Sequence, residues 1–116
     1  VSVSSDIATC DFSNGGVFYV TPSSATSFEI NITNANPGAS TNTTSVITLL
    51  IDASTYESFG NTCKVNTVSR TLWFSGGAAA VDITSSSVVA QTVSIIYSGS
   101  ATVPVAIMSS VVPYFA

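Results

Sequence analysis

The chain has 116 residues, of which 46% are hydrophobic and only 7% are charged, and this length suits one domain with its own core. Its Lys and Arg residues number 2 in total, and its formal net charge is −4. Few cations argue against nucleic-acid binding and against attraction to anionic membranes. The absence of histidine from the sequence excludes a Ser-His-Asp or Cys-His catalytic device.

The first nine residues, VSVSSDIAT, alternate apolar and polar side chains as a half-buried strand does. Such a strand either packs within its own domain or is donated to a neighbouring copy, where it adds to a sheet. Donation divides the chain into a donor strand at residues 1–9 and a β-sandwich head domain at residues 10–116. The side chains predicted to fill the neighbour's sockets are Val1, Val3, Ser5 and Ile7.

Two cysteines, Cys10 and Cys63, suggest a disulfide and an oxidising location, because their number is even and the chain is poor in charge. The bond would close a loop of about fifty residues and contribute about 4 kcal/mol in the chain-entropy model. The alternative is a pair of buried thiols. No histidine or second cysteine pair completes a metal site.

Eight further runs of apolar or alternating residues follow, with turn residues between them, and helix signals are nearly absent. The run at 45–52 is almost continuously apolar and is predicted to be a central strand. Pro104 and Pro113 confine the last run to a sheet edge or to irregular ends. The predicted strands are 16–22, 27–33, 45–52, 63–69, 70–75, 78–84, 88–98 and 101–116.

This pattern predicts an all-β fold, a single antiparallel β-sandwich of immunoglobulin-like character. The sandwich could be incomplete and completed by a donor strand from a neighbouring subunit. A small barrel is the alternative.

Three sequons predict N-linked glycans at Asn31, Asn42 and Asn61, the last in the rarer Asn-x-Cys form. Chance and turn chemistry are the competing explanation in a chain rich in Ser, Thr and Asn. The chain begins with Val, has no basic leader and has no apolar run of bilayer length, so we expect a mature secreted chain whose signal peptide has been removed. The six carboxylates form no metal-binding or catalytic pattern, and we expect no enzyme activity, cofactor or metal.

The short leading strand, the cysteine that follows it, the second cysteine in mid-chain and Tyr114 near the end resemble the outline of a donor-strand-exchange pilin. Bacterial type 1 pilins share this outline, although their arm is longer and their first cysteine lies further along. The Ser/Thr/Asn-rich composition with sequons is more similar to the archaeal thread filament subunit, a glycosylated β-sandwich linked by donor strands.

This resemblance implies a structural subunit of an extracellular cell-surface filament. Identical subunits would assemble head-to-tail into a homopolymer that serves adhesion or biofilm formation. The alternative function is a monomeric secreted β-sandwich, such as an adhesin, an S-layer-associated protein or a carbohydrate-binding module. A hydrolase that uses paired carboxylates is the least supported reading.

Overall fold

The computed structural model describes residues 1–24, 27–35, 44–56, 58–74, 86–97 and 106–115. The predicted strand at 78–84 and the sequon residue Asn42 therefore lie outside the described residues. The described part is an all-β sandwich with a single short 3₁₀ helix, η1 (Phe12–Asn14), which confirms the predicted fold class.

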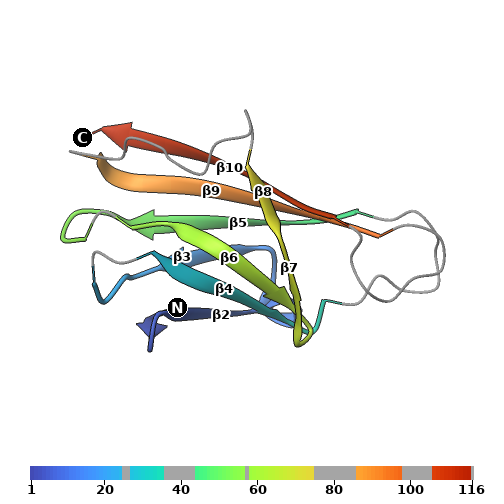
Figure 1. The fold of residues 1–116 in the computed structure, drawn as a ribbon. Coiled ribbons are helices and arrows are strands. Elements are labelled where there is room, and N and C mark those ends of the chain that lie inside the picture. The colour runs from blue at the N-terminus through green and yellow to red at the C-terminus, as the bar shows by residue number, and fades with distance from the viewer. Residues whose placement is uncertain (25–26, 36–43, 57, 75–85, 98–105, 116) are drawn as a thin grey trace.

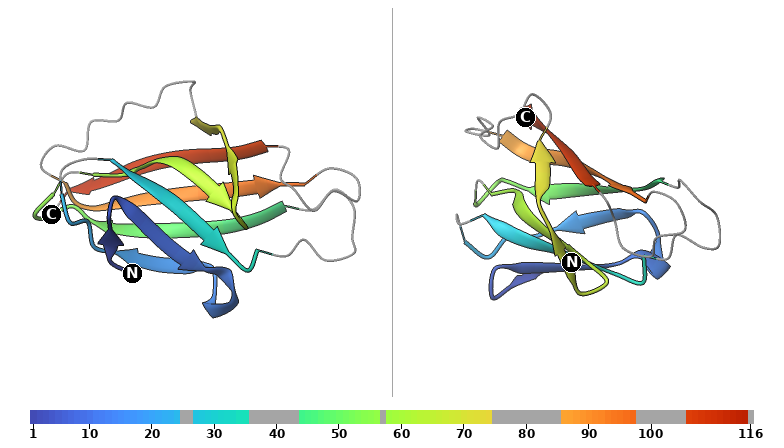
Figure 2. Two further views of the ribbon diagram at one scale, coloured as in Figure 1. Left: turned by 60° about the horizontal axis from the view of Figure 1, so that its bottom comes forward. Right: turned by 45° about the vertical axis from the view of Figure 1, so that its right-hand side comes forward.

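Two five-stranded sheets face each other (Figures 1 and 2). The first sheet has the order β1-β2-β4-β6-β7, with bounds β1 (Val3–Ser4), β2 (Ile7–Asp11), β4 (Phe28–Thr33), β6 (Gly60–Val65) and β7 (Val68–Arg70). The second sheet has the order β3-β5-β9-β10-β8, with bounds β3 (Val17–Val20), β5 (Thr44–Asp52), β9 (Ser86–Ile96), β10 (Ala106–Phe115) and β8 (Leu72–Phe74).

The core lies between the sheets and is formed by alternate residues of the central strands, as the sequence pattern predicts. In β4 and β5 the inward side chains are fully buried, while their neighbours in sequence are partly exposed. The strand β5 lies between β3 and β9, so the prediction of a central strand at 45–52 is confirmed. The inward residues of these two strands are Phe28, Ile30, Ile32, Ile47, Leu49 and Ile51.

The sheets are mixed, and the prediction of a purely antiparallel sandwich is wrong. The strand β4 runs parallel to both β2 and β6, and β3 runs parallel to β5. The reason is the chain path, because β3 lies in the second sheet although its neighbours in sequence, β2 and β4, lie in the first. A strand that returns to its sheet after such an excursion is free to run parallel to the strand it left.

One edge of the sandwich is crossed by β7 and β8, which follow each other with only Thr71 between them but belong to different sheets (Figure 2). The predicted strand at 63–69 is instead the hairpin of β6 and β7, whose turn is Asn66-Thr67. Val65 and Val68 pair across this turn, and both turn residues have positive φ angles, 46° and 71°.

The last predicted strand is β10, which pairs along its whole length with β9. The strand β8 pairs only with Ile107–Ser109 of β10, so the half that contains Pro113 has β9 as its single partner among the described strands. This placement agrees with the expectation that proline, which has no N–H to donate, lies where one side of its strand has no hydrogen-bonded neighbour.

Candidate functional site

The leading segment is a hairpin in this structure, and the prediction of one continuous strand over residues 1–9 is wrong. The strand β1 turns at Ser5-Asp6 and pairs antiparallel with β2, with Val3 opposite Ala8 and Ser4 opposite Ile7. In this structure, residues 1–4 therefore pair with their own chain. The structure holds one chain, so donation of the segment to a neighbouring copy stays a prediction.

The two-residue turn also changes which side chains face the core. Val3 and Ala8 are cross-strand partners and both are buried, whereas Ile7 is 37% exposed and Val1 is 44% exposed. Partners in such a hairpin have numbers of opposite parity, so the inward set moves from odd residues in β1 to even residues in β2. Of the four predicted socket-filling residues, Val3 alone is buried in this structure, and Ser5 lies in the turn.

Main-chain hydrogen bonds tie residues 1–3 to the end of β3 in the second sheet. The amino nitrogen of Val1 donates to the Tyr19 carbonyl at 2.9 Å. Thr21 N–H donates to the Val1 carbonyl at 2.9 Å, and Val3 N–H donates to the Thr21 carbonyl at 3.1 Å. The segment thus bridges both sheets, because its next residues pair with β2 in the first sheet.

The turn places two residues other than glycine in the left-handed region, Ser5 at φ 51° and Asp6 at φ 60°. An L-residue there costs roughly 1–2 kcal/mol, and aspartate tolerates the region better than serine. The favoured sequence for a two-residue hairpin is Asn-Gly, which avoids this cost. The Ser5-Asp6 hinge is therefore a place where the closed hairpin is strained.

The two cysteines are buried free thiols, and the predicted Cys10–Cys63 disulfide is wrong for this structure. Cys10 is paired with Ile32 of β4, and Cys63 is paired with Ile30 of the same strand. With β4 between them, the two cysteines are two strand spacings apart, about 9.5 Å across the sheet. A disulfide needs Cα atoms within about 7 Å.

Burial makes both thiols poor nucleophiles. It raises the pKa of Cys10 to about 11 and, together with the nearby Cys10 and Glu29, the pKa of Cys63 to about 12. The thiolate is the reactive form, so neither side chain is suited to nucleophilic chemistry at neutral pH.

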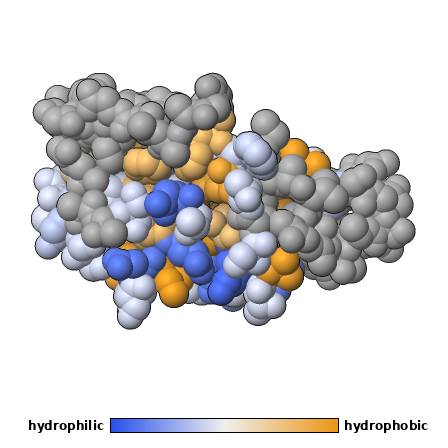
Figure 3. All heavy atoms as spheres, viewed as in Figure 1, coloured by the Kyte–Doolittle hydropathy of each residue, from blue (hydrophilic) through white to orange (hydrophobic). Residues whose placement is uncertain are grey.

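Two of the three predicted glycosylation residues are described, and both lie on the first sheet. Asn31 is half-buried in β4, and its Nδ2 donates to Thr9 Oγ1 at 3.4 Å. Asn61 is exposed and lies at a bulge in β6, between the paired residues Gly60 and Thr62. Hydrophilic side chains gather on this face, in the region that β4 and β6 occupy (Figures 1 and 3).

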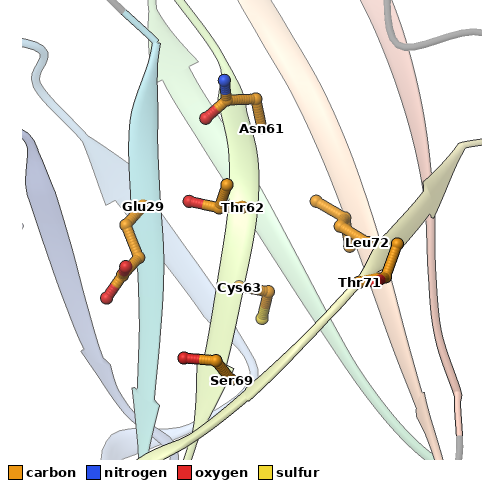
Figure 4. A pocket seen from close by; sticks show the side chains of 7 residues that line it. All are labelled: Glu29, Asn61, Thr62, Cys63, Ser69, Thr71 and Leu72. Carbon is orange, nitrogen blue, oxygen red and sulfur yellow. The ribbon is translucent and has the colours of Figure 1, made fainter.

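A groove of about 510 Å³ opens beside Asn61, where β6 and the β7–β8 crossing strand diverge (Figure 4). The hydroxyls of Thr62 and Ser69 point to the same side in this view, toward the strand that carries Glu29, and Leu72 points toward β6. The described residues that line the groove are Glu29, Asn61, Thr62, Cys63, Ser69, Thr71 and Leu72. The sequence pattern gave no indication of this groove, because the divergence of two paired strands is a tertiary feature.

The edge of β6 above the groove is closed by a side chain from the opposite sheet. Gln91 is completely buried in β9, and its Oε1 accepts from Gly60 N–H at 2.8 Å. Its Nε2 donates to the Gly60 carbonyl at 2.7 Å and to Ser109 Oγ at 3.2 Å. The amide thus occupies both main-chain groups of Gly60, as a neighbouring strand would do.

Three carboxylates among the described residues, those of Asp11, Asp52 and Glu29, make contacts within the chain. Asp11 Oδ1 accepts from Ser13 N–H, Ser13 Oγ and Asn34 Nδ2, and these bonds hold the Asp11 pKa below 3.8, with the Ser13 hydroxyl as the largest cause. Asp52 accepts from Ser54 Oγ and N–H, which likewise lowers its pKa, the hydroxyl again acting most strongly. Glu29 faces Lys64 with 3.8 Å between Oε1 and Nζ.

No cluster of metal-ligating side chains occurs among the described residues. The same part of the chain contains no helix with the length and hydrophobicity needed to cross a bilayer. Comparison of the chain with models of known protein families, with curated proteins and with solved structures finds no match. Any function must therefore be argued from the hairpin, the groove and the surface themselves.

Proposed function

We propose that this chain is a structural, non-catalytic subunit of an extracellular filament whose copies are joined by exchange of residues 1–4. The observation that carries the proposal is the hinge, because Ser5 and Asp6 both adopt left-handed backbone angles to fold the segment back. An exchanged segment would extend straight from β2 and release this strain. Short strained hinges favour such swapping between copies.

The contacts of the segment are the same whether it is donated within a chain or between chains. Val3 would fill the same buried position, and residues 1–3 would make the same three main-chain hydrogen bonds to Tyr19 and Thr21 of the receiving copy. The balance between the closed and exchanged forms is then set by the hinge and by the concentration of copies. Exchange releases about 1–2 kcal/mol of backbone strain at each hinge residue. The closed form is favoured because the tethered segment has an effective concentration in the millimolar range beside its own acceptor.

Exchange of this kind is a head-to-tail contact, since each copy donates at its hairpin and receives beside the end of β3. Unless the contacts close into a ring, they propagate as a filament. A surface with 2 cations and 6 carboxylates offers little charge repulsion between copies. A glycan at Asn31 would lie on the face of β4 and keep such a filament hydrated.

The second candidate function is a monomeric secreted binding module. The observation that favours it is the pairing of residues 1–4 with their own chain, which closes one edge of the sandwich without a partner. The two candidates differ in one measurable property, the oligomeric state at high concentration.

The experiment compares hinge variants by light scattering after size exclusion and by negative-stain microscopy. The variant Ser5→Asn/Asp6→Gly gives the turn its favoured sequence and should hold the chain as a monomer. The variant Ser5→Pro requires φ near −65°, opens the hairpin and should increase assembly. The matched control is Thr67→Gly, which relieves the equivalent turn of the β6–β7 hairpin and should leave assembly unchanged.

Filaments or oligomers that respond to the two hinge variants in opposite directions support exchange. A wild-type chain that stays monomeric at every concentration, with no effect of Ser5→Pro, establishes the monomeric module instead.

A further inference from the structure

We propose that the groove between β6 and the β7–β8 strand binds a neutral saccharide. The inference concerns a surface away from the leading hairpin and does not depend on exchange of residues 1–4. The groove volume of about 510 Å³ lies within the range of about 300–1,000 Å³ that small-molecule sites occupy.

The first argument is the set of polar side chains that line the groove. Asn61 and Thr62 come from β6, Ser69 comes from β7, and Thr71 comes from the crossing point between β7 and β8. None of these four side chains hydrogen-bonds to another described residue. They contribute one amide and three hydroxyls to a lining that also contains the apolar side chain of Leu72, and this mixture of donors, acceptors and a nonpolar surface suits a sugar ring.

The second argument is charge. Glu29 is the one carboxylate among the described lining residues, and Lys64 balances it from 3.8 Å away. One carboxylate beside a cation gives no net attraction for a cationic or anionic ligand. The Glu29 carboxylate still accepts hydrogen bonds from sugar hydroxyls, and such charge-assisted bonds are stronger than neutral ones.

The third argument excludes an extended peptide as the occupant. Strand addition needs a row of unpaired main-chain groups along a sheet edge. On β6 the edge is taken at Cys63 by pairing with Arg70, and at Gly60 by the Gln91 amide. Only Asn61 and Thr62 lie between these two points, and two residues are too few to pair with an added strand.

Among the described residues, the lining contains no aromatic ring on which a sugar could stack. We therefore expect weak binding by a single groove, with a dissociation constant near the millimolar range. Display of many copies on one assembly would raise the apparent affinity through multivalency.

The test is a titration of isotope-labelled protein followed by amide chemical shifts. The protein is the closed-hairpin variant Ser5→Asn/Asp6→Gly, so that the result does not depend on assembly. The probes are glucose, mannose, galactose and N-acetylglucosamine with their di- and tetramers, added to about 50 mM because weak sites of this kind saturate only at such concentrations. A peptide with the sequence of residues 1–9 serves as the competing strand-type ligand.

Saturable shifts at Asn61, Thr62, Ser69 and Thr71 with at least one saccharide support the site. Thr62→Val and Glu29→Gln should each weaken that binding by about fivefold or more, the effect of losing a hydrogen bond. The control Thr48→Val lies on the outer face of the other sheet and should leave the affinity unchanged. Absence of saturable shifts with every sugar, shifts elsewhere on the domain, or binding of the peptide in the groove would overturn the proposal.

Discussion

The side-chain amide of Gln91 bonds to both main-chain polar groups of Gly60, although the two residues lie in different sheets. The clamp satisfies a buried glutamine and at the same time closes the edge of β6. The two exposed strand edges are thus covered in different ways. A side chain covers the edge of β6 at Gly60, and the main chain of residues 1–3 covers the edge of β3.

Replacement of Gln91 by leucine should destabilise the domain by about 2–4 kcal/mol, because the N–H and C=O of Gly60 lose their partners in a buried position. Urea denaturation measures the free energy of unfolding. The control is Thr92→Val, at the next position of β9, where the side chain is only partly buried. A Gln91→Leu variant as stable as the control would show that the clamp contributes nothing.

Glycine is required at position 60 because a Cβ there would lie 2.4 Å from both Cδ1 and Cγ1 of Ile30. Gly60→Ala should cost about 1–3 kcal/mol of stability through overpacking. Gly16→Ala is the control, because its Cβ would meet only the Val46 carbonyl oxygen at 3.4 Å. In a double-mutant cycle, Ile30→Ala should offset part of the cost of Gly60→Ala, and strict additivity would contradict the contact.

Acid should weaken the fold through Asp11 and Asp52. The folded-state pKa of each is lowered below 3.8, so each contributes stability that is present above pH 3.8 and lost as pH falls through the folded pKa. Both groups are exposed, so the loss should be modest. Thermal unfolding between pH 7 and pH 2 should show a fall below pH 4 that the variant Asp11→Asn/Asp52→Asn lacks; equal slopes in both proteins would refute this assignment.

Both thiols should be inaccessible in the native protein, since Cys10 and Cys63 are buried and their pKa values are raised to about 11 and about 12. Titration with a thiol reagent at pH 8 should find no reactive thiol in the native protein and both thiols after unfolding in guanidinium. If the unfolded, unreduced protein exposes none, the two cysteines are joined, and the packing of β2, β4 and β6 described above must differ.

Strand positions were predictable because alternation in residues 27–33 records burial on one face directly, and because the continuous apolar run in residues 45–52 marks a strand inside a sheet. The hairpins at Ser5-Asp6 and Asn66-Thr67 were missed because neither turn contains glycine, the usual signal for left-handed backbone angles. Missing the first turn caused a second error. The sequence pattern predicted that Ile7 faces inward, whereas in the structure Ile7 is exposed and Ala8 is buried.

The candidate site was harder to predict than the strands. Gln91 could have been noticed as a polar residue on the inward side of an apolar strand, between Val89 and Val93. Its partner Gly60 lies 31 positions away in sequence, and no local pattern connects them. The groove depends likewise on where β7 leaves the first sheet for the second.

Exchange of the leading segment is tested most directly by an engineered disulfide between positions 2 and 21. Ser2 and Thr21 are exposed and form a parallel β-bridge in the structure. The variant Ser2→Cys/Thr21→Cys, with both native cysteines replaced by alanine, is concentrated, oxidised and run on a non-reducing gel. Exchange predicts a ladder of covalently linked chains that reduction collapses to one band. A single band of internally bridged monomer at every concentration would contradict it.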